Sequence, residues 1–172
     1  WMSNWQYANQ VPTLQYRSAN SIPRDLGLFE YKGNTYCSVT PSEEITAARS
    51  KKPSKSLSEA CEMVVNLKGD ATITLSNSKG EKVVMTYNAK DETFSMDRTL
   101  SGKTDFSSDF AATTKAPTYG KISQLRIFID KSSIEVMDAE GKMAMTNLVF
   151  PSKPYNKVTI QGKGKYQVYN IK

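Results

Sequence analysis

The sequence contains no histidine among its 172 residues, and it has only two cysteines, Cys37 and Cys61. Histidine is the commonest general base, the usual activator of a nucleophile and the most frequent nitrogen ligand of zinc. Its absence argues against serine-protease-like and zinc-hydrolase chemistry, and we expect neither a metal nor a cofactor. Two cysteines allow one disulfide at most. Because each lies in an apolar run, we favour buried free thiols, while pairing of Cys37 with Cys61 stays open.

Long apolar runs are also missing. No stretch approaches the roughly 18 apolar residues that span a bilayer, and no basic segment followed by an apolar one opens the sequence. We therefore expect no membrane partner. Trp1 falls inside a stretch with a strand-like pattern. This predicts a piece of a longer protein, for which a missing leader says nothing about the location of the parent.

The charge is moderate but unevenly placed. The formal net charge is +6, and charged residues make up 23% of the chain, which is ordinary for a folded domain and excludes a disordered one. Residues 141–172 carry six lysines and no acid. Because these lysines stand singly at turns, we do not expect a nucleic-acid partner. Lone surface lysines also protect edge strands from aggregation.

Apolar residues alternate at period two from about residue 24 onward, and turn-forming residues interrupt the pattern every eight to twelve positions. This pattern is typical of an all-β sandwich or barrel. The pair Gly33 and Asn34 predicts a first hairpin, and Gly69 with Asp70 separates two further apolar stretches. We expect about a dozen strands in all. Their apolar positions centre on residues 26–28, 35–39, 63–67, 71–75, 83–87, 94–96, 125–129, 134–136, 143–145, 158–160 and 166–171.

Two stretches lack the alternation and are predicted to be long loops, Pro41 to Ser58 and Ser101 to Gly120. The second has residues at 107–110 that are compatible with one helical turn. Residues 1–23 differ again, being aromatic and polar, with prolines that disfavour strand pairing. We therefore divide the chain into a strand and linker from a neighbouring domain, 1–23, and a β-domain, 24–172. No internal repeat is found, which argues against a complete propeller.

Candidate catalytic acids must come in pairs, because glycosidic cleavage needs two carboxyl groups roughly 5–10 Å apart. Asp130 and Glu135 flank a predicted hairpin turn that contains Ser132 and Ser133. The favoured interpretation is structural, with Asp130 opening the turn and Glu135 solvated or ion-paired. Asp97 and Arg98 are expected to form a structural charge pair.

Exposed aromatic rings can stack on sugars. Trp1, Trp5 and Tyr7 would share one face of a strand, where they either pack against protein or contact a sugar. Packing is the favoured interpretation.

Three separated blocks resemble glycoside hydrolase family 32, which contains levanases, inulinases and invertases. Within the third block, Asp130, Ser132, Ser133, Glu135 and Val136 fall on the family pattern, and Met137 stands where phenylalanine is usual. The blocks are WMSNWQYANQVPTLQYRSANSIPRDLGL (1–28), DRTLSGKTDF (97–106) and LRIFIDKSSIEVMDAEGKMAMTNLVFP (125–151).

The resemblance implies the C-terminal part of such an enzyme, a two-layer antiparallel β-sandwich of concanavalin/lectin-like type preceded by the last propeller strand. The family's nucleophilic aspartate follows Trp-Met-Asn and precedes proline, and its acid lies in a Glu-Cys segment. Trp1-Met2-Ser3-Asn4 has no such aspartate. In Ala60-Cys61-Glu62 the glutamate follows the cysteine, which reverses the Glu-Cys order of the acid segment. The resemblance thus implies a non-catalytic module whose parent is a retaining β-fructosidase, extracellular or periplasmic.

The implied partner is the catalytic five-bladed propeller of the same parent chain, and fructan is a second possible partner. Leu14, Tyr16 and Ile22 are the candidates for packing between the domains. Trp1 and Trp5 are candidates for fructosyl binding in the intact parent only. If the sandwich itself binds sugar, exposed rings are required, with Tyr119, Tyr155 and Tyr169 as candidates.

Overall fold

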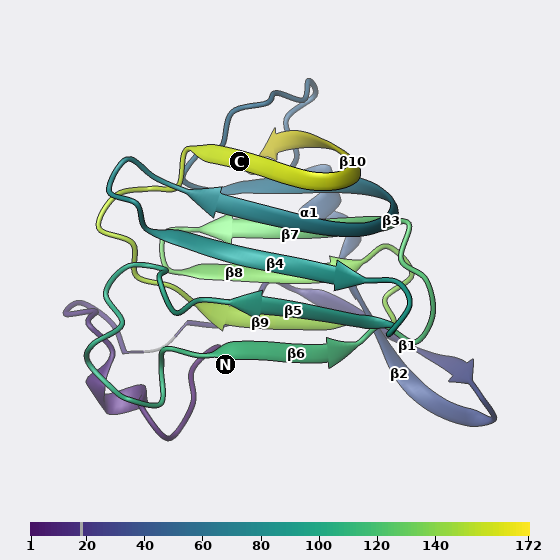
Figure 1. Cartoon of the computed structure of the whole chain (residues 1–172), viewed down its shortest axis with the longest axis horizontal. Helices are drawn as coiled ribbons and strands as arrows, with labels where there is room; N and C mark the ends of the chain where they lie inside the picture. The colour runs from purple at the N-terminus through teal and green to yellow at the C-terminus, as the bar shows by residue number, and fades with distance from the viewer. Residues whose placement is uncertain (18) are drawn as a thin grey trace.

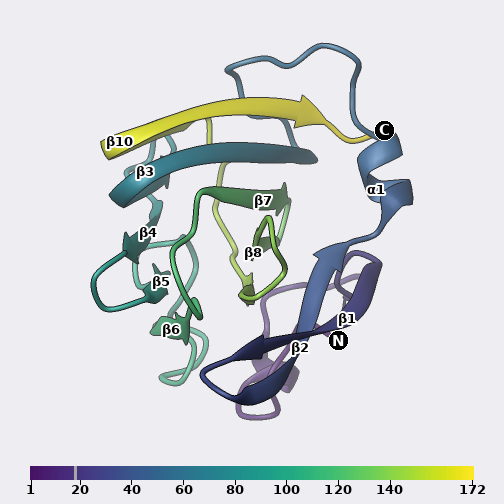
Figure 2. The same cartoon turned by 90° about the vertical axis from the view of Figure 1, so that its right-hand side faces the viewer.

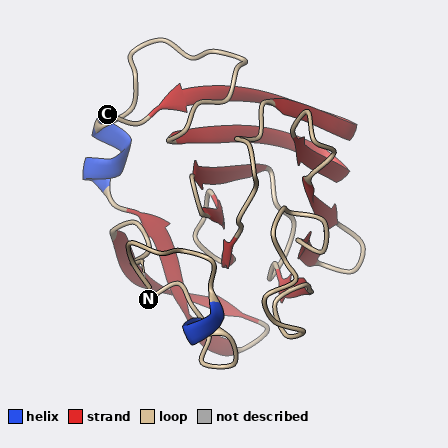
Figure 3. Cartoon of the chain, turned by 90° about the vertical axis from the view of Figure 1, so that its left-hand side faces the viewer, coloured by secondary structure: helices blue, strands red, loops and turns tan. Residues whose placement is uncertain are grey.

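The computed structural model describes residues 1–17 and 19–172, and this part of the chain forms ten strands and two short helices (Figures 1 and 3). All strand pairs are antiparallel. The elements are η1 (Ala8–Gln10), β1 (Arg24–Tyr31), β2 (Asn34–Pro41), α1 (Glu43–Ala47), β3 (Cys61–Ser76), β4 (Lys82–Asn88), β5 (Thr93–Asp97), β6 (Thr113–Pro117), β7 (Gln124–Asp130), β8 (Ser133–Asp138), β9 (Ala144–Leu148) and β10 (Lys157–Asn170).

Strand β3 joins two layers. Its first part, 61–66, pairs with β7, and its last part, 71–76, pairs with β4. Strand β10 pairs along the other edge of β3 over nearly its whole length. One layer is therefore β4-β5-β6 and the other β7-β8-β9, with β3 and β10 spanning both at the top of Figure 1. Figure 2 shows the two layers side by side beneath β3 and β10. The expected all-β, two-layer antiparallel sandwich is confirmed.

The two layers nearly close on themselves at the opposite side. The far strands are β6 and β9. The Asn147 side-chain amide donates to the Thr114 hydroxyl at 2.9 Å, and that hydroxyl lies 3.1 Å from the sulfur of Met145. Side chains, rather than a ladder of backbone hydrogen bonds, thus connect the free edges, and the body is a curled sheet that stops just short of a barrel.

The main core lies between the layers and is built from the period-two alternation. On β3 the odd-numbered residues Met63, Val65, Ile73 and Leu75 point inward and are almost completely buried. Each such side chain contributes about 1.5–3 kcal/mol by leaving water. The core continues with Val83, Met85, Tyr87, Phe94, Met96, Leu125, Ile127, Ile134, Val136 and their neighbours. These are the positions that the sequence pattern predicts.

Two predicted strand breaks are wrong. Gly69 (φ 132°) lies within β3, and Gly162 (φ 97°) lies within β10, where the register shifts between Gly162 and Gly164. These glycines bend two strands that continue as a pair. The chain consequently has ten strands in its described part rather than about a dozen.

The predicted loops and the front of the chain also need correction. The stretch 41–58 contains α1, and the stretch 101–120 contains β6. The strand expected in the first 23 residues is not formed in their described part, which carries only η1. A strand needs a neighbour for its backbone groups. None of the described helices has the length and apolar character needed to cross a membrane.

A second, smaller core attaches this front segment to the sandwich. Tyr7 and Val11 pack with Phe110 and Leu148, and the Tyr7 and Phe110 rings meet edge to face at 5.3 Å. Residues 107–110 form only a turn, closed by the Phe110 N–H on the carbonyl of Ser107 at 3.2 Å.

Both cysteines are free. Cys61 is buried, as expected, but Cys37 is exposed on β2, which corrects the prediction of two buried thiols. Burial raises the pKa of the Cys61 thiol.

Candidate functional site

The linker before β1 is attached to the sandwich through one buried carboxylate, that of Glu135 on β8. The backbone N–H of Ile22 donates to its Oε1 at 3.0 Å, and Arg24 forms an ion pair with its Oε2. Thr146 donates to Oε2 at 3.4 Å. The outer face of β8 is covered by these contacts, and every residue of that strand is buried. Glu135 is thus a point of attachment for the linker.

Asp130 does not combine with Glu135 into an acid–base pair. The register of β7 and β8 places Asp130 opposite Ser133 and Glu135 opposite Phe128. Asp130 is exposed, and its carboxylate accepts the N–H of Lys131 at 2.7 Å. The oxygens of Glu135 are already held by the linker. A pair that cleaves glycosides needs one protonated and one ionised carboxyl on either side of a substrate. This hairpin does not provide that arrangement.

Of the remaining hairpin residues, Ser132 also contacts the linker. The hydroxyl of Ser132 lies 3.0 Å from the Tyr16 hydroxyl, and Ser133 is buried at the start of β8. Tyr16 is nevertheless nearly half exposed, and Ile22 is half-buried. Leu14 contacts little, with 94% of its surface exposed. Of the three candidates for interdomain packing, the structure leaves Leu14 and Tyr16 open to solvent.

Trp1 and Trp5 lie together at the front of the chain. Their ring centroids are 5.1 Å apart with the planes tilted by 44°, and Trp5 is 87% exposed. Tyr7, expected on the same face, is instead buried in the second core. Two adjacent exposed indoles form an apolar surface that suits either a sugar ring or a protein partner.

The β1–β2 hairpin carries apolar residues on both faces, a feature that the sequence analysis missed. Phe29 and Tyr36 face inward and surround the ring of Tyr119, at 5.4 and 4.6 Å between centroids. On the opposite face Leu26 and Leu28 are 73% and 76% exposed. The sequence did carry a signal for this feature, because β1 has apolar residues at consecutive positions. A hairpin that packs on one body with one face needs apolar residues on that face only.

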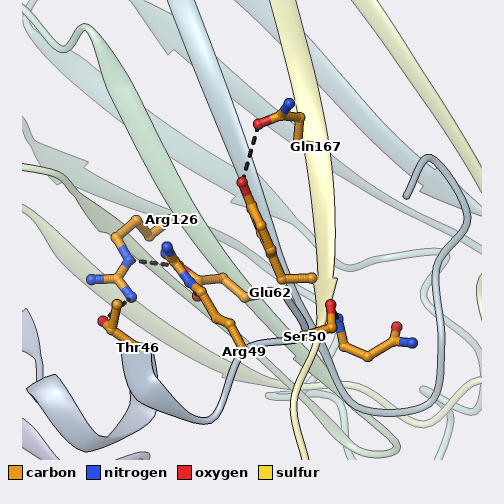
Figure 4. A network of polar contacts seen from close by, with 8 residues as sticks. Thr46, Arg49, Ser50, Glu62, Arg126 and Gln167 are labelled. Carbon is orange, nitrogen blue, oxygen red and sulfur yellow. Dashed lines mark hydrogen bonds and ion pairs between the residues drawn. The ribbon is translucent and has the colours of Figure 1, made fainter. Parts of the chain in front are cut away.

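A second buried carboxylate, Glu62 on β3, holds the segment that contains α1 (Figure 4). Arg49 contacts it through Nε and Nη2, and Arg126 through Nε, all at 2.5 Å. Arg126 also donates to the Thr46 hydroxyl at 3.0 Å, and the Arg49 guanidinium lies 5.0 Å from the centre of the Tyr169 ring. The hydrogen bonds to Glu62 raise the pKa of Arg49. One carboxylate thus holds two cations.

The other tyrosine candidates are covered to different extents. Tyr119 packs under the hairpin, Tyr155 is buried with its hydroxyl on the Ser101 carbonyl at 2.5 Å, and Tyr169 is partly covered by Arg49. No group of three or more potential metal ligands occurs among the described residues.

The expected pair of Asp97 and Arg98 is wrong. Arg98 is buried, donates to the Leu148 carbonyl and the Tyr7 hydroxyl at 3.2 Å each, and lies 4.2 Å from the centre of the Phe110 ring. Asp97 instead accepts the N–H of Thr99 at 2.8 Å. The cation serves the second core, because two aromatic faces and two oxygens surround it.

Comparison with known proteins gives one consistent family. Residues 30–172 match the family described as "Glycosyl hydrolases family 32 C terminal". A levanase of Bacillus subtilis is 32% identical over 178 residues, with 89% of this chain and 26% of the levanase covered. The extracellular exo-inulinase inuE of Aspergillus niger is 28% identical, with 88% and 33% covered. The chain therefore spans about a quarter to a third of the length of these relatives.

Solved structures show the same fold. The exo-inulinase of Aspergillus awamori superposes with a TM-score of 0.87 at 23% identity, over 100% of this chain and 39% of that one. A β-fructofuranosidase of Schwanniomyces occidentalis gives 0.71 at 19% identity, over 98% and 43%. The resemblance seen in the sequence is confirmed, and the chain belongs to glycosyl hydrolase family 32, as a C-terminal domain of that family.

Proposed function

We propose that this chain is a non-catalytic β-sandwich module of a fructan-degrading enzyme of the levanase, inulinase or invertase type, and that it stabilises a catalytic propeller domain in the same parent chain. The relatives are named levanase and exo-inulinase, and each is three to four times as long as the part that matches. The parent would be a retaining β-fructosidase whose catalytic carboxylates lie outside these residues. Several relatives are named extracellular, which supports an extracellular or periplasmic parent.

The observation that carries the proposal is the exposed face of β1. Leu26 and Leu28 stand side by side on a strand whose opposite face is packed, so they are held rigidly toward solvent. Contiguous exposed apolar side chains mark interaction surfaces. Covering the two leucines would contribute about 3–5 kcal/mol. Leu14 and Tyr16, on the linker that precedes this strand in sequence, are exposed as well.

The proposed division is a linker and remnant of the neighbouring domain at 1–23, followed by the sandwich at 24–172. The contacts of Glu135 with Ile22 and Arg24 support it, because they hold the end of the linker on the sandwich. A rigid linker would transmit the position of one domain to the other. Glu135 then has a structural role in fixing that position.

The test is made in the full-length parent enzyme. Leu26→Ser combined with Leu28→Ser should lower the melting temperature of the catalytic domain by several degrees, with the activity of the surviving enzyme unchanged at low temperature. Leu100→Ser is the matched control, since Leu100 is also exposed but lies between β5 and β6. Equal melting temperatures for the double variant and the parent would refute the proposal.

The alternative is a fructan-binding module, favoured by the exposed Trp1–Trp5 pair. Isothermal titration calorimetry of this chain with levan and inulin distinguishes the two. Binding heat that disappears in Trp5→Ala would support sugar binding, whereas no heat with either polymer is expected for the stabilising module. Fructose release by this chain that is lost in Asp130→Asn would contradict both.

A further inference from the structure

The structure gathers lysines that are far apart in the sequence into one basic ledge, defined here by Lys51, Lys52, Lys55, Lys163 and Lys165. The first three belong to the loop between α1 and β3, and the last two to β10; all five are exposed. In Figures 1 and 2 this loop arches beside β10 near the C-terminus. In the sequence these lysines form two separate groups, 51–55 and 163–165.

Backbone hydrogen bonds fix the loop to the strand. The N–H of Ser54 donates to the Val168 carbonyl at 2.8 Å, and the N–H of Val168 donates back at 3.0 Å. The N–H of Ser50 donates to the Asn170 carbonyl at 2.8 Å. The Lys55 ammonium lies 4.5 Å from the centre of the Tyr166 ring and donates to the Tyr166 carbonyl. The loop that carries Lys51, Lys52 and Lys55 is therefore fixed along β10 rather than forming a mobile tail.

None of the five ledge lysines forms an ion pair in the described part of the chain. Glu62, at its base, is buried and already holds both Arg49 and Arg126. Glu59, the acid closest to the loop lysines in sequence, forms its ion pair with Lys131. Strand β10 itself contains no acid. A row of unpaired ammonium groups creates a positive potential that attracts polyanions.

The chemistry of the ledge disfavours two kinds of polyanion. Nucleic-acid sites use exposed aromatic rings and forked guanidinium groups. Here the Tyr166 and Tyr169 rings lie against Lys55 and Arg49, and the guanidinium of Arg49 is occupied by Glu62. Proteins that lie in a membrane surface usually add exposed apolar side chains to their basic residues. The large exposed apolar side chains of the described chain all lie outside the ledge, at Trp1, Trp5, Leu14, Tyr16, Leu26, Leu28 and Leu100.

The rest of the outward face of β10 is neutral and polar. Thr159, Gln161 and Gln167 are exposed between and beside the lysines, and Asn66 is exposed on β3 opposite Lys165. Hydroxyl and amide groups can donate to and accept from sugar hydroxyls. From Lys163 to the end of β10 the row extends for about 25 Å. That length accommodates several units of an extended polymer.

We propose that the ledge binds an extended anionic polysaccharide, with the lysines contacting its carboxylate groups and the polar residues of β10 its hydroxyls. The occupant differs from the uncharged fructan expected for the parent. Relatives named extracellular would meet such polymers rather than nucleic acid, which supports this choice. The proposal does not depend on the function assigned to the exposed face of β1.

Polygalacturonate is the probe, and its affinity for the 172-residue chain is measured by calorimetry over a series of salt concentrations. The test variant replaces Lys51, Lys52, Lys163 and Lys165 with Gln. It should bind at least tenfold more weakly at low salt, and the slope of log affinity against log salt should fall by about three. Melting curves of all variants check that they are folded.

The control variant replaces four exposed lysines away from the ledge, Lys79, Lys90, Lys103 and Lys115, with Gln, so that its net charge is the same. It should lose less than twofold in affinity, and dextran, a neutral polymer, should not bind. An equal loss in both variants would show attraction by net charge alone and overturn the proposal. Absence of polygalacturonate binding would also overturn it, as would tighter binding of double-stranded DNA or of vesicles containing phosphatidylglycerol.

Discussion

Glu62 shows how far a single residue can determine the attachment of a segment. Its carboxylate has no exposed surface and contacts Arg49 from the loop and Arg126 from β7. Removing charges from water is costly, so an arrangement of this kind holds only when all partners are present. The short helix α1 and the loop after it have no core of their own, since no residue of α1 is buried. The ion pairs are therefore a main attachment of this segment to the sheet.

At this site we predict that Glu62→Gln is strongly destabilising. The variant keeps the shape of the side chain but leaves two partly buried guanidinium groups without a counter-charge, which should cost about 3–5 kcal/mol. Glu59→Gln is the control, because Glu59 and Lys131 are both mostly exposed and their ion pair contributes about 0–1 kcal/mol. Urea unfolding measures both. A loss below 1 kcal/mol for Glu62→Gln would contradict the role given to the cluster.

The period-two alternation of β3 puts Glu62 on the polar face of the strand, together with Asn66 and Lys68. Its period-two position is correct, yet Glu62 is buried whereas the other two are exposed. The covering atoms come from Arg49 and Arg126, which are distant in sequence, and alternation within one strand carries no information about them. The same limit applies to Arg98, whose neighbours come from residues 7, 110 and 148. Local patterns predict which way a side chain points but not what lies over it.

At the scale of elements, the paired bends in β3 and β10 allow one strand to serve both layers. Beyond the bend, β3 leaves β7 and begins to pair with β4, while β10 follows it throughout. Gly162 lies against the backbone of Asp70 and Ala71, with no space for a side chain. Gly69 has an unusual φ but open space around it. The two glycines therefore serve the bend in different ways.

We accordingly predict that Gly162→Ala is more damaging than Gly69→Ala. A Cβ at position 162 would overlap the carbonyl oxygen of Asp70, in addition to the strain of the positive φ. At position 69 only the strain remains, which is of order 1–3 kcal/mol. Thermal unfolding should show the larger loss for Gly162→Ala. Equal losses would mean that the backbones separate readily at the bend, so that close packing there is not required.

The elements that were predicted correctly share a strong apolar alternation, as in β4 and β7. Strand β6 was missed because Thr113–Pro117 has almost no apolar residue, and its half-exposed positions reflect its place at an edge. The bends at Gly69 and Gly162 were mistaken for strand ends, because glycine occurs both at bends within a strand and at the turns between strands. The exposed leucines of β1 were missed for the opposite reason, since an apolar strand was assumed to be covered.

At the scale of the whole molecule, the second core decides how the front segment sits on the sandwich. Tyr7 contributes its ring to Phe110 and Phe106 and its hydroxyl to Arg98. Arg98 is buried and follows Asp97 in the sequence, but it contacts the Tyr7 hydroxyl, the Leu148 carbonyl and aromatic rings instead of that carboxylate. Its Nε has no partner in the described chain. The stability of this buried cation therefore depends on its two remaining acceptors, the Leu148 carbonyl and the Tyr7 hydroxyl. The segment 1–11 is thus held by one tyrosine more than by any strand pairing.

We therefore predict that Tyr7→Ala releases the front segment while the sandwich stays folded. The amides of Ala8 and Gln10, bonded to the carbonyls of Asn4 and Tyr7 at 2.8 and 2.9 Å, should exchange with solvent at least about tenfold faster. Amides in the centre of β3 should change little, because the main core between the layers does not include Tyr7. Trp5→Ala is the control, since Trp5 is exposed and its loss should leave this protection intact. If Tyr7→Ala leaves the exchange at Ala8 and Gln10 unchanged, the ring and hydroxyl of Tyr7 are not what holds the segment. If it unfolds β3 as well, the two cores form one cooperative unit, and the front segment is part of the sandwich rather than a linker to another domain.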